Sequence, residues 1–290
     1  MSELRYETPK TAQEAVMLMT SSHGTGKILA GGTDLLIQMR AGRARPGTII
    51  DVKHIPEMAA VVPEAGGFRI GAAVPCMQLV ENKAFAAAWP GVVDGINLIG
   101  SVQVRGRATV GGNLCNASPA ADSVPAMIAA GAVASVMGPN GRREVPVEDI
   151  PAGPGKTSLA QGEMVTSFFL PHRPARSGDA YLRFTPRSEM DIAVVGVGVN
   201  LTLDEKGVCT AARVALGAVA AKAMLVPECA AALIGTTVDE AALEKLAQAA
   251  SAAAKPIDDK RGTKAFRIKV SGVLAKRAAL VALRRAKGEK

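Results

Sequence analysis

The sequence predicts an α+β protein made of three units, which span residues 1–56, 57–175 and 176–290. Helix and strand signals alternate from the N-terminus onward. The stretch at 171–179 has the proline, arginine and glycine content of a linker, and the chain beyond about residue 226 has mostly helical patterns. A chain of 290 residues is long enough for two or three such units with ample core.

The first unit begins with a helix whose start is marked by its side chains. Thr11 and Glu14 stand three residues apart, before the apolar residues Val16 and Met19, which is the spacing of a capping box. The other predicted elements of this unit are a strand at 27–30, a helix at 35–42 closed by Gly42, and a strand at 47–53. A glycine pair therefore stands in the turn between the first strand and its helix.

The second and third units are predicted from their apolar patterning. The second unit is predicted to contain strands at 68–74, 132–138 and 163–171, and helices at 76–89 and about 119–130. The third is predicted to contain strands within 191–204 and 209–219, followed by helices. A second glycine pair, at 111–112, precedes the helix at 119–130.

The composition excludes several classes of protein. Hydrophobic residues make up 48% of the chain, yet it has one Trp, two Tyr and six Phe, so aliphatic side chains and Met must form the core. No run of about 18 uncharged apolar residues indicates a membrane span, and the N-terminus does not resemble a signal peptide. Four scattered cysteines, without ligand spacing, argue against a disulfide framework, a zinc site or an iron–sulfur cluster: Cys76, Cys115, Cys209 and Cys229. We expect a cytoplasmic protein.

The net charge of +8 raises the alternative of a nucleic-acid-binding protein. Much of the basic excess lies in the last 35 residues, where basic and apolar positions alternate as on one solvated face of an amphipathic helix. Few aromatic residues are interleaved for base stacking. A solvated or partner-facing surface is therefore favoured over nucleic acid.

Both glycine pairs fail the common nucleotide-binding motifs. Gly31-Gly32 and Gly111-Gly112 lack the GxGxxG spacing of a Rossmann turn. The stretch "PAGPGKTS" ends like a P-loop, but Ile150 stands where the first glycine is required.

A different use of glycine fits these two turns. Successive backbone N–H groups in a tight turn form a concave anion site, and glycine lets a diphosphate approach the main chain. Two such turns could hold one long dinucleotide from opposite sides, with side-chain donors from Thr33, Thr109, Asn113 and Ser118. Taken alone, either pair is explained better by a turn or by close strand packing.

The residues around the glycines carry a resemblance. "AGGTDLL", followed about 80 residues later by "TVGGNLCNASPAADSVP", resembles the FAD-binding medium subunit of molybdenum hydroxylases, the family of the flavin subunits of carbon monoxide dehydrogenase and bacterial xanthine dehydrogenase. "GPGKTSLAQGEMVTSFFLP", "YLRFTPRSEMDIAVVGVGV" and "PIDDKRGTKAFR" extend the resemblance over nearly the whole chain. It implies a two-subdomain FAD-binding fold of the vanillyl-alcohol-oxidase (PCMH) type, followed by a C-terminal α+β domain.

The resemblance also implies which residues contact FAD. They form a first loop, a second loop and several single positions: Ile28, Leu29, Ala30, Gly31, Gly32, Thr33, Asp34, Leu35, Ile99, Thr109, Val110, Gly111, Gly112, Asn113, Ser118, Asp122, Val165 and Arg183. Ile99 would lie near the flavin ring, Val165 on the adenine side, and Asp122 would accept a hydrogen bond from the cofactor. Arg183, where a related member carries Lys, would place a positive charge near the reduced flavin. The alternatives are a helix N-cap for Asp122 and a surface ion pair for Arg183.

The function implied is that of an electron-transfer subunit with noncovalently bound FAD. The [2Fe–2S] clusters and the molybdopterin cofactor would belong to a small and a large partner subunit, in a dimer of heterotrimers, and FAD would pass electrons to NAD, a quinone or dioxygen. Three isolated histidines, His23, His54 and His172, are expected on the surface or in loops rather than as flavin attachment sites. The alternative is a stand-alone flavin-dependent oxidoreductase.

Overall fold

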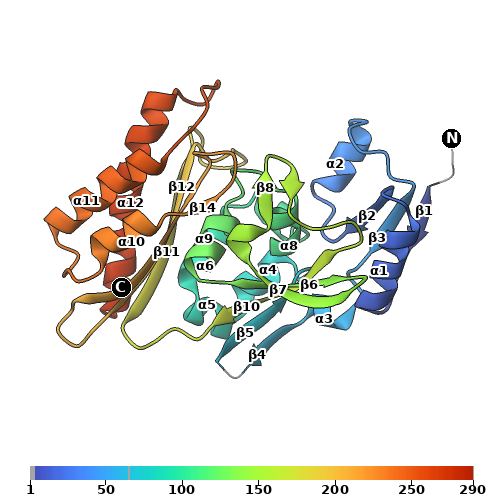
Figure 1. The fold of residues 1–290 in the computed structure, drawn as a ribbon, viewed down its shortest axis with the longest axis horizontal. Coiled ribbons are helices and arrows are strands. Elements are labelled where there is room, and N and C mark those ends of the chain that lie inside the picture. Colours follow the sequence, from blue (N-terminus) through green and yellow to red (C-terminus); the bar gives the residue numbers. More distant parts are fainter. Residues whose placement is uncertain (1–3, 65, 290) are drawn as a thin grey trace.

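The computed structural model describes residues 4–64 and 66–289, which form three main β-sheets arranged along one long axis. The N-terminal sheet lies at one end of that axis and the C-terminal helices lie at the other, with the central sheet between them (Figure 1). None of the helices in this part of the chain is long and apolar enough to cross a membrane.

The first sheet contains three parallel strands in the order β1-β3-β2. Its elements are β1 (Arg5–Glu7), α1 (Ala12–Ser21), β2 (Gly26–Leu29), α2 (Leu35–Arg40), β3 (Thr48–Asp51) and α3 (Pro56–Ala59). Thr11 caps α1 as predicted, because its hydroxyl oxygen accepts a hydrogen bond from the Glu14 N–H. The carboxylate of Glu14 departs from a full capping box and accepts from the N–H of Lys10 instead.

The central sheet is antiparallel and has the order β4-β5-β10-β6-β7. Its strands are β4 (Val61–Glu64), β5 (Gly67–Gly71), β6 (Val133–Gly138), β7 (Gly141–Pro146) and β10 (Met164–Pro171). The helices of this region are α4 (Cys76–Glu81), α5 (Lys83–Ala88), α6 (Pro90–Asn97), α7 (Val102–Arg105), α8 (Val110–Cys115) and α9 (Ser123–Ala129). A short turn, η1 (Val147–Asp149), leads into the small pair β8 (Pro151–Gly153) and β9 (Lys156–Thr157).

Two predicted helices of this region differ from the structure. The helix expected at 76–89 is broken at Asn82, whose side chain accepts from the Phe85 N–H and so starts a new helix. The helix expected at about 119–130 is the shorter α9, which begins only at Ser123, since the residues before it are in turns or without regular structure.

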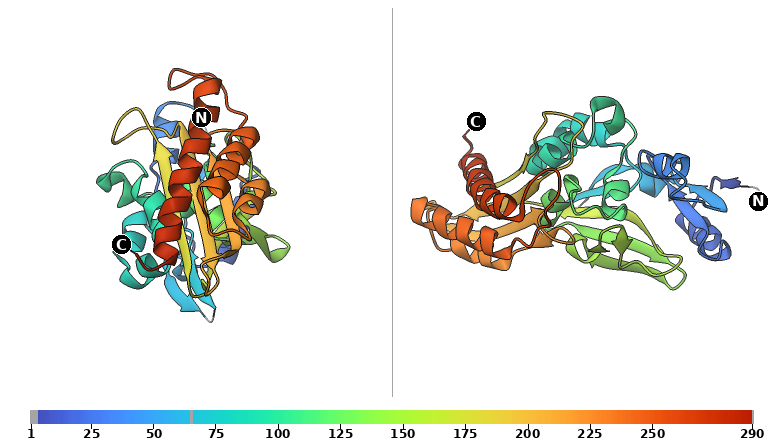
Figure 2. Two further views of the ribbon diagram at one scale, coloured as in Figure 1. Left: turned by 90° about the vertical axis from the view of Figure 1, so that its left-hand side faces the viewer. Right: turned by 90° about the horizontal axis from the view of Figure 1, so that it is seen from above.

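The third sheet is antiparallel, in the order β11-β12-β13-β14. Its elements are β11 (Ser177–Phe184), β12 (Val195–Leu203), β13 (Cys209–Gly217), β14 (Met224–Leu225), α10 (Pro227–Leu233), α11 (Glu240–Ala253) and α12 (Lys264–Ala286). The three helices cover one face of this sheet (Figure 2), and α6 and α9 of the central region pack on its strands as well. The linker expected at 171–179 is shorter, because β10 runs to Pro171 and β11 begins at Ser177.

Buried apolar side chains form two clusters rather than three. One cluster joins the first sheet to the central region, and the other fills the space between the third sheet and its helices. The predicted boundary at 56/57 lies within α3, and that at 175/176 lies between β10 and β11. The division into three units stays a prediction.

A polar contact joins the last helix to the central region. Arg285, in the last turn of α12, donates to the carboxylate of Asp94 on α6 at 2.6 and 3.2 Å, and to the carbonyl of Asp179 at 2.7 Å. The Asp179 carboxylate accepts from the N–H of Gly91 at 2.8 Å and pairs with Arg173. Burial raises the pKa of Asp179 to about 6, against the lowering effect of the two arginines.

Candidate functional site

A cleft of about 460 Å³ lies where the first sheet meets the central region, and both glycine pairs line it. Its volume falls within the usual range of small-molecule sites. We call residues 30–34, between β2 and α2, the first glycine turn, and residues 109–113, at the start of α8, the second glycine turn.

The first glycine turn presents backbone donors to the cleft. Gly32 has φ +75°, a conformation that L side chains rarely adopt. None of Gly31, Gly32, Thr33 and Asp34 donates its N–H to another group of the described residues. These N–H groups are accessible, and successive free backbone donors beside a cleft can bind an anionic ligand.

The second glycine turn is helical, which corrects the expected loop. Thr109 caps α8 by accepting from the Gly112 N–H at 2.9 Å, so Gly111 and Gly112 lie in its first turn, where N–H groups lack partners within the helix. A side chain at Gly111 would collide with the backbone of Ala72, whereas a Cβ at Gly112 would meet only the Thr109 hydroxyl, at 3.1 Å. Gly112 is thus the glycine of this turn that is open to the cleft.

Most of the residues expected to contact a cofactor line the cleft. They are Ile28, Ala30, Gly31, Gly32, Thr33, Asp34, Leu35, Ile99, Thr109, Gly111, Gly112, Asn113 and Val165. Leu29 and Val110 are buried in the protein at 8% and 1% exposure. Ser118 accepts from the N–H of Ala120 and, like Asp122 and Arg183, is not among the lining residues.

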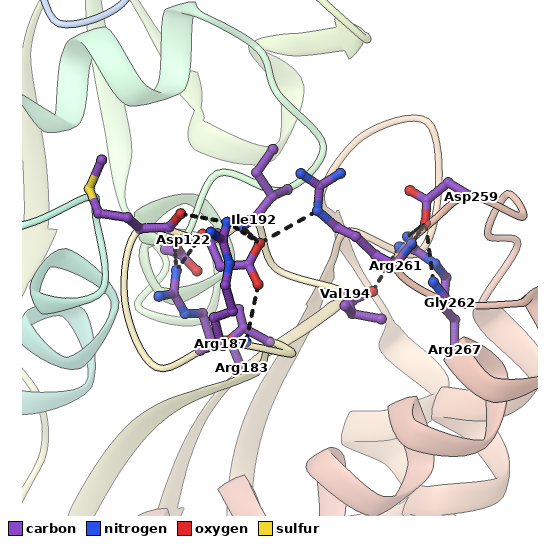
Figure 3. A network of polar contacts seen from close by, with 12 residues as sticks. Asp122, Arg183, Arg187, Ile192, Val194, Asp259, Arg261, Gly262 and Arg267 are labelled. Atoms are coloured by element: carbon purple, nitrogen blue, oxygen red, sulfur yellow. Dashed lines mark hydrogen bonds and ion pairs between the residues drawn. The ribbon is translucent and has the colours of Figure 1, made fainter.

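Asp122 and Arg183 form a buried ion pair (Figure 3), and neither residue is among those that line the cleft. The guanidinium Nη1 lies 2.6 Å from Asp122 Oδ2, and the Tyr181 hydroxyl donates to Oδ1 at 2.9 Å. Burial raises the pKa of Asp122 to about 6, although Arg183 and Tyr181 act to lower it. Asp122 stands at the N-cap position of α9, but its side chain makes no capping hydrogen bond. Arg183 forms an ion pair as the alternative has it, but the pair is buried rather than on the surface, because the arginine side chain is 5% exposed.

The ion pair is connected both to the cleft and to the C-terminal helices. Toward the cleft, Asn113 Oδ1 accepts from the hydroxyl of Ser123, the residue after Asp122, at 2.7 Å. Toward the helices, Arg183 approaches the carbonyl of Asp191 at 3.5 Å, and the Asp191 carboxylate is contacted by Arg261 (Figure 3). The N–H of Ile192, foremost among several donors, lowers the pKa of Asp191.

The cleft also contains residues that the sequence did not single out. They are Lys27, Gln38, Val52, Met58, Ala72, Ala108, Cys115, Asn116, Gly155, Leu159, Glu163 and Met164. The last four belong to the stretch "GPGKTSLAQGEM", which had carried the resemblance without an assigned role. Gln38 and Asn116 each lie three residues beyond a predicted contact segment, so only the helical fold of both segments brings them to the cleft.

Two families match consecutive parts of the chain. Residues 2–173, more than half of the sequence, match the family described as the FAD binding domain in molybdopterin dehydrogenase. Residues 180–282 match the C-terminal domain of the CO dehydrogenase flavoprotein. The chain belongs to this family of molybdenum hydroxylase flavoproteins.

Relatives of this flavoprotein family align over most of its length. The carbon monoxide dehydrogenase medium chain of Afipia carboxidovorans is 32% identical over 282 residues, which cover 97% of each chain. The putative xanthine dehydrogenase FAD-binding subunit of Escherichia coli is 33% identical over 201 residues, 69% of this chain and 68% of that one. A solved structure of reconstituted CO dehydrogenase from Oligotropha carboxidovorans superimposes with a TM-score of 0.93 at 31% identity, over 98% of each chain. The predicted fold, the family and the FAD cofactor are confirmed.

The cleft of this flavoprotein fits FAD on structural grounds. The free N–H groups of the first glycine turn suit a diphosphate, and Gly112 leaves room where a side chain would intrude. His23, His54 and His172 are exposed and do not line the cleft, as expected. Among the described residues, no group of three His, Cys, Asp or Glu side chains is arranged to hold a metal ion.

Proposed function

We propose that this chain binds FAD in the cleft between its two glycine turns and serves as the electron-transfer subunit of a molybdenum hydroxylase. The free backbone donors of the first glycine turn and the open glycine of the second, which line the same cleft, carry the proposal. FAD supplies a redox centre that accepts electrons one at a time and releases them singly or in pairs. The protein holds it, shields it and sets its electrostatic environment.

The electrons come from [2Fe–2S] clusters in a small partner subunit, and an external acceptor such as NAD, a quinone or dioxygen removes them. A large molybdopterin subunit hydroxylates the organic substrate and selects it. The relative from Afipia carboxidovorans is named a medium chain, which agrees with a place among several subunits. We propose a dimer of heterotrimers, located in the cytoplasm.

The residues around the cleft favour electron transfer over substrate chemistry. The lining contains Lys27, Asp34 and Glu163 as charged side chains, and no histidine or aromatic residue is found among the described residues that line it. General acid–base work on a bound substrate usually needs such a group within hydrogen-bond reach of the reacting atom. The Asp122–Arg183 pair is not part of the lining, and its guanidinium charge is balanced by a carboxylate rather than presented freely.

The first test is the mode of cofactor binding in the purified full chain. We expect one FAD per chain, released entirely into the supernatant by acid precipitation, because none of the described residues that line the cleft is a histidine. Yellow colour that stayed with the precipitated protein would contradict noncovalent binding. Failure to take up FAD at all would contradict the proposed function.

The second test is anaerobic reduction of the FAD-loaded chain without partner subunits. We expect dithionite to bleach the flavin band, and purines, aldehydes, N-heterocycles and carbon monoxide to leave it unchanged, since substrate oxidation belongs to the large subunit. Adding the small and large subunits should restore reduction by the cognate substrate. Bleaching by an organic substrate in the chain alone would establish the stand-alone oxidoreductase instead.

A further inference from the structure

Helix α2 is weakly attached to the rest of the protein, although it lies beside the cleft. None of its six residues is buried, and Leu36 and Ile37 are 51% and 60% exposed. The helix lies above β2 at the outer edge of the molecule (Figure 1). Gly32 and Gly42, both with positive φ, bound the segment at its two ends. A segment with so little buried apolar surface is expected to open locally at a low cost in free energy.

One side-chain hydrogen bond ties this segment across the cleft. Gln38 Nε2, on α2, donates to Asn116 Oδ1, at the C-terminal end of α8, over 3.1 Å. The two residues are 78 positions apart in sequence, and both line the cleft. Within the described chain, no other side-chain hydrogen bond or ion pair joins residues 31–46 to another part of the protein. The bond therefore connects the segment after the first glycine turn to the segment after the second.

We propose that Gln38 and Asn116 form a latch that holds α2 over the cleft and determines how slowly FAD leaves it. The inference rests on the proposed function, because it requires FAD to occupy this cleft. A ligand gripped between the two glycine turns can leave freely only when the turns separate, and the amide pair opposes that separation. Since a neutral hydrogen bond contributes modestly to stability, breaking the latch should accelerate release by about fivefold.

The test measures FAD release from the full chain. FAD-loaded protein is mixed with an excess of a flavin-binding apoprotein, and free flavin is followed as it is captured. The variants are Gln38→Ala, Asn116→Ala and the double variant, with Arg40→Ala as a control on the exposed face of the same helix. We expect the rate of FAD release to be about fivefold higher in each single variant than in the wild type, with no further increase in the double variant. The control should release FAD at the wild-type rate.

Hydrogen exchange supplies a readout independent of FAD release. In the FAD-loaded protein, amides of residues 35–46 should exchange faster in both single variants than in the wild type, while the strands of the central sheet exchange at unchanged rates. Unchanged exchange in this segment would overturn the latch.

Other outcomes separate the latch from the proposed function. Additive effects of the two substitutions on the release rate would mean that each amide contacts FAD by itself. Release at the wild-type rate in both single variants would mean that the bond has no role. Either result overturns the latch but leaves the proposed function standing. A wild-type chain that takes up no FAD would overturn both proposals.

Discussion

The two glycine turns contain the same dipeptide but use it in different conformations. The first turn is irregular, with a left-handed residue at Gly32, and leaves a run of backbone donors free. The second is the start of a short helix, fixed by the Thr109 cap. In the first turn Gly31 packs against the backbone of Arg107 and Ala108, and in the second Gly111 packs against Ala72.

Each pair combines a structural glycine with one that serves the cleft. Gly31 and Gly111 permit close contact between backbone segments that belong to different parts of the fold. Gly32 provides the turn, and Gly112 leaves the cleft open. Substitutions at the two kinds of position should therefore affect different measurements.

The largest expected effect is on folding, at Gly31. A Cβ at this position would overlap the carbonyl of Arg107, and backbone on both sides cannot move aside cheaply. We expect Gly31→Ala to lower the free energy of unfolding by about 4 kcal/mol, measured by urea denaturation. Gly112→Ala is the matched control, because its Cβ meets only a hydroxyl at 3.1 Å, and it should remain within about 1 kcal/mol of the wild type. Equal losses at the two positions would refute the distinction.

The next effect is on FAD binding, at Gly112. Valine there would project into the cleft without meeting backbone, so Gly112→Val should keep the fold and weaken FAD binding about 100-fold, or about 2.7 kcal/mol. Fluorescence titration gives the affinity and urea denaturation of the apoprotein gives the stability. A variant with wild-type FAD affinity would show that Gly112 has a purely structural role.

The smallest effect concerns the buried carboxyl of Asp122. Because the pKa of Asp122 is raised from 3.8 to about 6, the folded state holds this proton at pH values where the unfolded state has lost it. The resulting stabilisation is complete below about pH 3.8 and is lost as the pH rises through about 6. Between pH 4 and 7 the wild type should therefore lose about 2 kcal/mol relative to Asp122→Asn, measured by urea denaturation across this range. A difference independent of pH would contradict the raised pKa.

Local signals in the sequence were sufficient for much of the fold. The Thr11 cap, the helix ended by Gly42 and the apolar strands of the third sheet depend on neighbouring residues, and each is confirmed. The resemblance predicts a loop at the second glycine pair, whereas the structure has the start of a helix there, and the Thr109 hydroxyl caps that helix in spite of the low helix propensity of glycine. A cap of this kind is visible in the sequence, and it would have corrected the prediction.

The remainder of the site depends on contacts between distant segments, which no local pattern encodes. Tyr181 and Arg183 reach Asp122 across about sixty positions because β11 packs beside α9. The Gln38–Asn116 bond likewise requires both subdomains to be in place. The resemblance identified Asp122 and Arg183 as important positions, but only the fold pairs them with each other.

The contact of Arg285 with Asp94 has a consequence for the order of events during protein synthesis. The two residues are separated by 191 positions, and Arg285 stands in the last turn of the last helix. Asp94 therefore leaves the ribosome long before its partner exists, and at typical elongation rates it waits about 10 to 40 seconds for it. During that interval the nascent FAD-binding region has to remain compact without the contact between Asp94 and Arg285. Its hydrophobic cluster provides the means to do so, since all of the buried members precede α12 and only Tyr181, Ala215 and Ala223 lie beyond residue 170.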